Sequence, residues 1–487
     1  MLFNSPVYGV FLIVTYVVYW ALRRHRLPRT IFLAVASYLF YIVGTYDAAT
    51  EQEVPFGAIG WTALCVAIIF VGSSLDFFIG KKLGKTENPA ARKALLLVSI
   101  VYYLGVLAVF KYFNFFCDSF ASLAHSLGAT SVKAPHLRLV LPFGISFFTF
   151  ETMSYTIDVY RREIEPSDRY LDYLLFVAFF PHLVAGPIVR PKQMLPQLAA
   201  EPVATDETKA EGLFLIATGL MKKIVIGDTL GINLVNRVFE QPTMYSSLEV
   251  LVGVYAYAIK IYADFSGYTD VARGSAKLFG LELPINFDAP YTAKNLQDFW
   301  HRWHISLSTW LRDYLYVPLG GNRGGTLFTY RNLWLTMVLG GLWHGASWNF
   351  VIWGALHGTM LGINRAWQRA KLPGLPKPVA IVLTFHFVCL AWIFFRAPTF
   401  DHAIVVISRI ARVGHFSMST ANLAPKVLAA LAVGFATHFI PRDWLDVVRG
   451  QFARLPAVAQ GVTLAFAAYA LHFAAAAKAE PFIYGQF

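Results

Sequence analysis

Long apolar runs separated by short polar loops dominate the pattern of the chain. The clearest runs lie at residues 8–22, 56–80, 95–116, 379–395, 428–439 and 462–477. An α-helix needs ~20 residues to cross the hydrocarbon core of a bilayer. Counted on that scale, together with shorter and interrupted apolar segments, the pattern predicts about ten to twelve transmembrane or re-entrant helices. The sequence therefore predicts an all-α polytopic membrane protein, in which residues 1–487 form a single membrane-embedded domain.

Two apolar segments, residues 141–162 and 176–198, do not resemble clean spanning helices. The first contains the acids Glu151 and Asp158, and prolines interrupt the second. Broken or re-entrant helices are tolerated at membrane depth only where they are buried in protein or line a water-filled cavity. We interpret this region as the wall of a cavity. Two full spans with ordinary proline kinks are the alternative.

Basic and acidic loops alternate along the N-terminal part of the chain. Residues 23–29 hold four arginines and residues 81–93 are also strongly basic, whereas residues 45–55 carry acids and no base. Because basic loops stay in the cytoplasm, this order predicts a periplasmic N-terminus. The first apolar run precedes its arginines, which is the reverse of a signal peptide, so we expect a first transmembrane helix.

The composition agrees with a membrane protein. Hydrophobic residues make up 56% of the chain and charged residues only 14%, and the mean hydropathy is +0.51. About a quarter of the residues in a soluble domain are charged. The net charge of +12 therefore reflects topology, and no basic surface stretch indicates nucleic acid. The three cysteines, Cys65, Cys117 and Cys389, show neither a metal-site spacing nor a disulfide pair.

The segment from Leu296 to Tyr314 is predicted to be one amphipathic helix. Its leucines and aromatic residues recur at three- and four-residue spacing, and its charged residues fall on the opposite face. Such a helix suits the membrane interface or the edge of a polar cavity. His304 falls at the margin of the apolar stripe. From the spacing alone, a structural and a functional role for His304 are both open.

His344 lies in a run without Asp, Glu, Lys or Arg between Arg331 and Arg365. Ionisable residues at membrane depth are costly and are usually retained for function. Glycines at 340, 341 and 345 permit the close approach of a ligand or a neighbouring helix. His357 falls on the opposite face if the helix is straight and then cannot share a site with His344. A general base and the proton relay of a transporter are both open for His344.

A long helix is predicted at residues 250–278. Asp264 and Tyr268 are four residues apart and share one face, so a carboxylate–phenol hydrogen bond is possible. Asp270 lies on a different face, which argues against a paired-carboxylate site, and we expect a neighbour such as Arg273 to satisfy it. Residues 211–226, interrupted by two lysines, predict a further span or half-span.

Five ordered motifs resemble one family. They read LPFGISFFTFETMSYTIDVYR, FPHLVAGPIVRP, YADFSGYTDVARGSAKLFG, FWHRWHISLSTWLRDYLYVPLGGNRGG and GGLWHGASWNFVIWGALHG. Together they are similar to the membrane-bound O-acyltransferase (MBOAT) superfamily, and more narrowly to its alginate O-acetyltransferase-like members. The resemblance covers residues 1–395. It implies a helical bundle around a central funnel or tunnel, with interfacial amphipathic helices and a catalytic core at about residues 138–396.

The resemblance also implies roles for individual residues. The near-invariant histidine of the superfamily maps to His344, as a general base or as the group that positions the acceptor, and its second functional histidine maps to His304. His301 stands where relatives often have arginine. Further residues in motif positions are expected to shape the cavity, with ordinary packing as the alternative: Tyr262, Asp264, Tyr268, Arg312, Asp313, Asn322, Trp343 and Trp348.

The implied function is that of an inner-membrane O-acetyltransferase. The acetyl group would come from a cytoplasmic thioester, acetyl-CoA, with no permanently bound cofactor and no metal. The acceptor would be an extracytoplasmic polysaccharide such as alginate, reached with a periplasmic or membrane-anchored acetyltransferase partner. A D-alanyl transferase of the same superfamily and a proton-coupled transporter are the alternatives.

Overall fold

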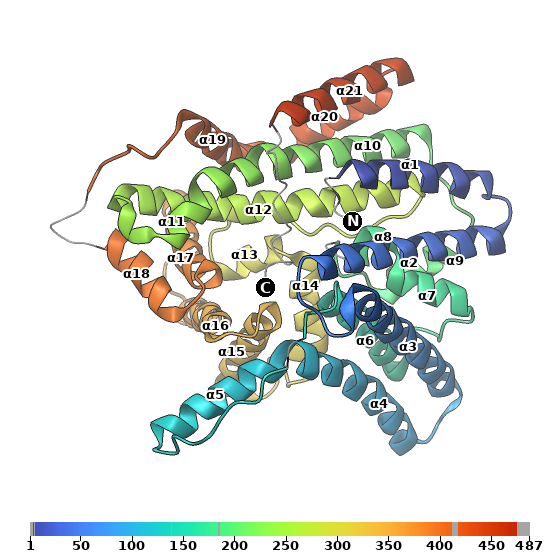
Figure 1. The fold of residues 1–487 in the computed structure, drawn as a ribbon, viewed down its shortest axis with the longest axis horizontal. Helices are drawn as coiled ribbons and strands as arrows, with labels where there is room; N and C mark the ends of the chain where they lie inside the picture. Colours follow the sequence, from blue (N-terminus) through green and yellow to red (C-terminus); the bar gives the residue numbers. More distant parts are fainter. Residues whose placement is uncertain (1–2, 4, 138, 184–185, 412–416, 475–487) are drawn as a thin grey trace. The chain divides into compact units, whose positions relative to one another are not determined.

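The computed structural model describes residues 3, 5–137, 139–183, 186–411 and 417–474. Every regular element within these residues is helical, which confirms the predicted all-α fold (Figure 1). Five of the described helices are long and apolar enough to cross a membrane: Arg26–Thr50, Gly57–Lys85, Pro89–Ser126, Lys377–Arg396 and Ala457–Ala474. Two shorter apolar helices, Pro6–Ala21 and Pro425–Phe439, accompany them. The chain is a multi-pass membrane protein, as predicted.

The chain divides into two compact units. Unit 1 comprises Met1–Thr205 and Ser275–Leu283, and unit 2 comprises Asp206–Gly274 and Pro284–Phe487. The single membrane-embedded domain, with a catalytic core at residues 138–396, stays a prediction.

Unit 1 is built from the first nine α-helices. They are α1 (Pro6–Ala21), α2 (Arg26–Thr50), α3 (Gly57–Lys85), α4 (Pro89–Leu107), α5 (Phe113–Ser126), α6 (Ile145–Arg161), α7 (Tyr170–Ala178), α8 (Phe180–Leu183) and α9 (Pro191–Ala199). A π-helical turn, Ala108–Tyr112, joins α4 and α5 into one helix of 38 residues. In this unit, α2 packs against α3 and α7, and α6 packs against α3 and α4.

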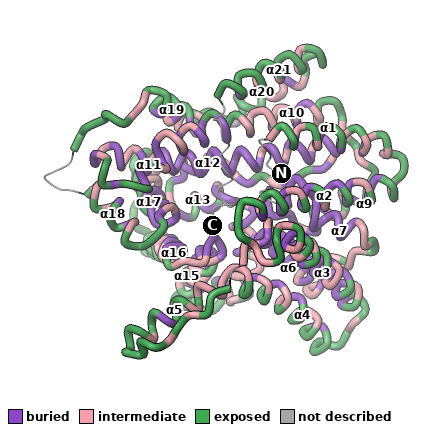
Figure 2. Tube along the Cα trace, in the orientation of Figure 1, coloured by how far each residue is buried: buried purple, intermediate pink, exposed green. Residues whose placement is uncertain are grey.

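Unit 2 holds most of the remaining helices. They are α10 (Asp206–Met221), α11 (Asn236–Glu240), α12 (Ser247–Leu278, whose last residues group with unit 1), α13 (Leu296–Arg302), α14 (Ile305–Leu311), α15 (Gly325–His344), α16 (Trp348–Arg369), α17 (Lys377–Arg396), α18 (Phe400–Ile410), α19 (Pro425–Phe439), α20 (Arg442–Arg454) and α21 (Ala457–Ala474). Further π-helical turns lie at Lys222–Asp228, Gly231–Val235 and Arg312–Tyr316, and 3₁₀ turns at Pro242–Met244 and Pro290–Thr292. Figure 2 shows α12 buried along most of its length and α21 largely exposed.

The two irregular apolar segments of unit 1 differ in structure. The first forms one helix of 17 residues, α6, which begins directly after Gly144 and is buried almost throughout. The second is divided into α7, α8 and α9, and the described residues from 172 to 189 are buried. The broken-helix prediction is thus confirmed for the second segment, while its role as a cavity wall stays a prediction.

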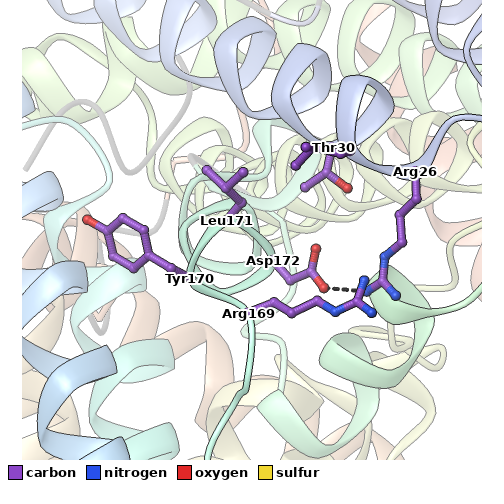
Figure 3. Close-up of a pocket in the computed structure, with 7 residues that line it drawn as sticks. Arg26, Thr30, Arg169, Tyr170, Leu171 and Asp172 are labelled. Atoms are coloured by element: carbon purple, nitrogen blue, oxygen red, sulfur yellow. Dashed lines mark hydrogen bonds and ion pairs between the residues drawn. The ribbon is translucent and has the colours of Figure 1, made fainter.

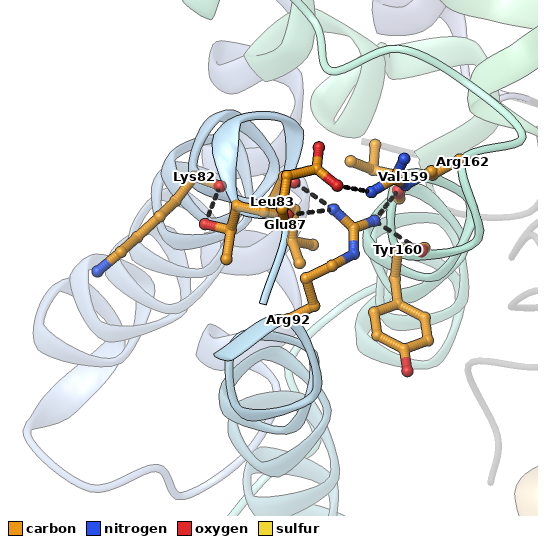
Figure 4. Close-up of polar contacts among 8 residues, drawn as sticks. Lys82, Leu83, Glu87, Arg92, Val159, Tyr160 and Arg162 are labelled. Atoms are coloured by element: carbon orange, nitrogen blue, oxygen red, sulfur yellow. Dashed lines mark hydrogen bonds and ion pairs between the residues drawn. The ribbon is translucent and has the colours of Figure 1, made fainter. Parts of the chain in front are cut away.

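Arg92 holds the C-terminal ends of two helices of unit 1 (Figure 4). Its guanidinium donates hydrogen bonds to the carbonyl oxygens of Leu83 and Thr86 at the end of α3, at 2.5 and 2.9 Å. It also donates to the carbonyls of Val159 and Tyr160 in α6, at 3.2 and 2.8 Å. The last carbonyls of a helix have no partner within the helix, and here one side chain supplies the missing donors. Sequence patterning had identified Arg92 only as a basic residue of a cytoplasmic loop.

Glycines allow α15 and α16 of unit 2 to approach backbone to backbone. A Cβ atom on Gly341 would lie 2.2 Å from the carbonyl oxygen of Phe350, and one on Gly354 would lie 2.3 Å from that of Met337. Both distances are far inside van der Waals contact, so only glycine fits at either position. The predicted close approach of a neighbouring helix at Gly341 is therefore confirmed.

Arg92→Gln is expected to destabilise unit 1, because the shorter, neutral amide cannot bond all four carbonyl oxygens at once. The free energy of unfolding should fall by about 1.5–3 kcal/mol, the range for a hydrogen bond to a charged group. Thermal unfolding of purified protein in detergent measures the loss. Lys93→Gln, which removes the same charge from an exposed neighbour, is the matched control and should leave the midpoint unchanged. Equal midpoints for the two variants would contradict the assignment.

Gly354→Ala is expected to destabilise unit 2, since the methyl group meets backbone that cannot rotate away. Overpacking typically costs about 1–3 kcal/mol. Gly362→Ala on the same helix is the control, because its Cβ would sit 3.6 Å from the Tyr330 ring, an ordinary contact. Alanine is favoured over glycine inside a helix by roughly 0.5–1 kcal/mol. The two substitutions should thus shift the unfolding midpoint in opposite directions, and a stabilised Gly354→Ala protein would refute the packing argument.

Candidate active site

The segment that contains His304 is broken in unit 2. The prediction of one helix from Leu296 to Tyr314 is wrong: α13 ends at Arg302 and α14 begins at Ile305. His304 stands at the break with φ 43°, in the left-handed region that residues with a side chain rarely adopt.

Residues 286–288 explain why the break is stable. The backbone carbonyl of Asn286 accepts from the Ile305 N–H at 3.0 Å, and its side-chain oxygen accepts from the Ser306 N–H at 3.1 Å. The Asp288 N–H donates to the carbonyl of Arg302 at 2.9 Å. A helix end leaves N–H and C=O groups unsatisfied, and a neighbouring segment satisfies them here. This tertiary contact, which periodicity does not reveal, sets the position of His304.

His304 is fully buried and not at a margin. Its ring packs edge-on against Phe265 of α12, with 4.6 Å between ring centroids, and lies 6.2 Å from the ring of Trp343. The break thus turns this imidazole into the aromatic interior of the unit.

His344 is the last residue of α15 and is 4% exposed. Its ring lies 5.0 Å from Trp343, 5.1 Å from Trp353 of α16 and 5.2 Å from Phe395 of α17. Trp343 is therefore a common neighbour of His304 and His344. The two histidines proposed from the sequence come from separate segments, the break before α14 and the end of α15, and both lie near the same indole.

His357 requires a correction. The straight helix assumed for residues 344–357 does not exist, because α15 ends at His344 and α16 begins at Trp348. The Trp353 ring lies 5.1 Å from His344 and 4.7 Å from His357, so both imidazoles contact one indole. His357 is fully buried, and neither of its ring nitrogens is hydrogen-bonded to any residue that the structure describes. Sequence reasoning excluded this residue; the glycines beside His344 were the signal that the helix turns back.

Asp264 lies in a buried ion network of unit 2. Its carboxylate accepts from Lys260 at 2.9 Å and from Lys223 at 3.2 Å, and Lys223 also donates to Asp228 at 2.6 Å. The hydrogen bond between Asp264 and the buried Tyr268 stays a prediction. The lysines were missed as partners, although Lys260 precedes Asp264 by one helical turn and the spacing marks it as a neighbour.

Asp270 forms the expected ion pair with Arg273 and a second one with Lys222. Arg273 lies 3.8 Å from its carboxylate, and Lys222 is closer at 2.6 Å. Lys222 also lies over the ring of Tyr262, 6.0 Å from its centroid. Both cations that pair with Asp270 belong to unit 2.

The remaining predicted cavity residues differ in exposure. Trp343 is buried between the histidines, whereas Trp348 is 58% exposed at the start of α16. Arg312 pairs with the adjacent Asp313 at 2.7 Å in a π-helical turn. Asn322 is exposed and accepts from the hydroxyl of Tyr316 at 2.5 Å. A role in the cavity stays a prediction for all of them, and burial favours Trp343.

The buried histidines and aromatic rings of unit 2 form a site suited to proton transfer. A neutral imidazole held by packing is the usual general base near neutral pH. The described residues contain no group of three or more His, Cys, Asp or Glu side chains that could hold a metal ion. The catalytic roles of His344 and His304 stay predictions.

Comparison with known proteins gives a consistent result. Residues 99–397 match the family model for the membrane-bound O-acyltransferase family. The chain is 38% identical to a probable alginate O-acetylase of Pseudomonas aeruginosa, over 89% of this chain and 79% of the relative. It is 35% identical to a peptidoglycan O-acetyltransferase of Helicobacter pylori, over 84% and 79%. It is 30% identical to a teichoic acid D-alanyltransferase of Bacillus subtilis, over 55% and 71%. The chain therefore belongs to the membrane-bound O-acyltransferase family and is a multi-pass membrane acyltransferase.

Proposed function

We propose that this protein is an inner-membrane O-acetyltransferase that acts on an extracytoplasmic polysaccharide such as alginate. The proposed acetyl donor is a cytoplasmic thioester, namely acetyl-CoA. The observation that carries the proposal is the placement of His344 and His304, from separate segments of unit 2, beside the shared ring of Trp343. The names of the relatives that cover most of the chain support acetyl as the transferred group.

The proposed reaction needs one base and one leaving thiol. His344 removes the proton from the acceptor hydroxyl, whose oxygen attacks the thioester carbonyl. A C–O bond forms, the C–S bond breaks, and the proton held by His344 passes to the departing thiolate. His304 orients the reacting group or shares the proton. The aromatic rings around both imidazoles exclude water, which would otherwise hydrolyse the thioester.

Delivery to the glycan is proposed to involve a second protein. A periplasmic or membrane-anchored acetyltransferase partner receives the acetyl group and completes its transfer to the sugar. The basic loops at residues 23–29 and 81–93 support the topology that this requires, with a periplasmic N-terminus and a cytoplasmic donor.

A D-alanyl transferase is the second candidate. The Bacillus subtilis relative supports it, but that match covers 55% of the chain, against 84–89% for the O-acetyl transferring relatives named above. Family membership favours either transferase over the proton-coupled transporter.

His344→Ala is expected to abolish transfer, because no neighbouring group replaces the base; removing a general base typically lowers the rate about 10²–10⁴-fold. Ester-linked acetate on exported glycans, and acetyl-CoA cleavage by purified protein, measure the effect. Membrane insertion and protein level should stay close to those of the wild type. Wild-type acetylation in this variant would remove His344 from the mechanism, and cleavage of a D-alanyl thioester alone would support the second candidate.

His304→Ala is expected to lower the same activity severely. His301→Ala is the matched control, because His301 lies three residues earlier with an exposed side chain. The His301 variant should retain wild-type acetylation. Equal activities for the two variants would show that His304 has no role beyond packing.

A further inference from the structure

Two pockets flank the start of α2 in unit 1, and Arg26 lines both. The larger has a volume of about 380 Å³ and is lined by Arg26, Leu27, Thr30, Arg169, Tyr170, Leu171 and Asp172 (Figure 3). The second, of about 270 Å³, is lined by Arg23, Arg24, Arg26, Arg29, Ala200 and Glu201. We refer to these two pockets together as the arginine pocket.

Positive charge exceeds negative charge in the larger pocket. Arg26 is bound to the nearly buried carboxylate of Asp172 at 2.6 Å. Figure 3 shows the side chain of Arg169 extending toward the same carboxylate. Two guanidinium groups and one carboxylate therefore line this pocket, and the carboxylate is paired with Arg26.

The second pocket is more basic still. Arg29 is buried and donates to the carbonyl oxygens of Arg23 and Ala200, at 2.9 and 3.2 Å, and no carboxylate among the described residues forms an ion pair with it. Arg23 and Arg24 are exposed, and neither is paired with a carboxylate of the described chain. Arginines that serve only to orient a membrane protein need not converge on a cavity. Here they do, with Glu201 as the one acid that lines this pocket.

We propose that the arginine pocket binds a phosphate group. Guanidinium groups present planar, paired donors that match phosphate oxygens, and they are weakly hydrated and therefore release water readily. Leu27, Tyr170 and Leu171 add an apolar wall beside the charge, which suits a ligand that carries a phosphate on a larger body. Basic pockets on the cytoplasmic side of membrane proteins bind phosphate-bearing head groups by this chemistry.

Two sources supply such a phosphate on the predicted cytoplasmic side. One is the phosphate-rich end of coenzyme A, the carrier of the proposed donor, and the other is the head group of an anionic phospholipid. Coenzyme A as the ligand rests on the proposed function, whereas the proposal that the pocket binds a phosphate group does not. Binding requires no turnover, so the two proposals can fail separately.

Binding of both probes by arginine variants tests the proposal. The full-length protein is placed in phosphatidylcholine nanodiscs, and the affinity for coenzyme A is measured by calorimetry. In parallel, the unfolding midpoint in detergent is measured with added short-chain phosphatidylglycerol or phosphatidylcholine. The variants are Arg23→Gln with Arg24→Gln, and separately Arg169→Gln. The control is Lys85→Gln with Lys93→Gln, which removes two exposed charges from the other basic loop.

Each arginine removed is expected to weaken binding about fivefold, from ~1 kcal/mol per basic residue at a membrane surface, and the pair about 30-fold. The lysine control should match the wild type. Loss of coenzyme A affinity identifies the donor as the source, and loss of stabilisation by phosphatidylglycerol identifies the lipid. If coenzyme A does not bind the wild type while stabilisation by phosphatidylglycerol depends on the arginines, coenzyme A as the donor is refuted and the phosphate site is supported. If neither probe distinguishes the arginine variants from the lysine control, the phosphate site is refuted.

Discussion

Helix ends buried inside a protein must find hydrogen-bond partners, and this constraint shapes both units of the chain. A buried N–H or C=O without a partner costs roughly as much as a lost hydrogen bond, which few folds tolerate. In unit 1, Arg92 supplies donors to the carbonyls of α3 and α6. In unit 2, residues 286–288 bond the two helix ends beside His304. The short and broken helices of this protein are stable because such partners exist.

The position of His304 depends directly on that arrangement. A continuous helix through residues 296–314 would carry this imidazole along its apolar margin. The break turns the ring toward Phe265 and Trp343 and removes it from solvent. The close packing of α15 and α16 has the same consequence for His344, because a helix that ends and turns back brings Trp353 against its ring. In both cases, the end of a helix places an imidazole among buried aromatic rings.

Charge is handled differently in the two units. The buried lysines of unit 2, Lys223 and Lys260, are matched by Asp264 and Asp228, as the high cost of an unpaired buried charge requires. The arginine pocket of unit 1 has five guanidinium groups and two acids along its lining. This surplus of guanidinium groups is the basis of the proposed phosphate site, because their paired donors match phosphate oxygens.

The sequence by itself determined the helical membrane fold and the identity of the family, and it predicted a functional role for His344. These follow from local features: the length of apolar runs, an ionisable residue in an uncharged stretch, and glycines three and four residues before it and one residue after it. Only the tertiary structure decided the break at His304, the return of His357 toward His344, the role of Arg92 and the convergence of arginines from residues 23–29 with Arg169. The physical reason is sequence separation: the periodicity of a sequence indicates only neighbours within one or two helical turns. The partners that end a helix, seat an imidazole or gather charge around a cavity lie far away along the chain.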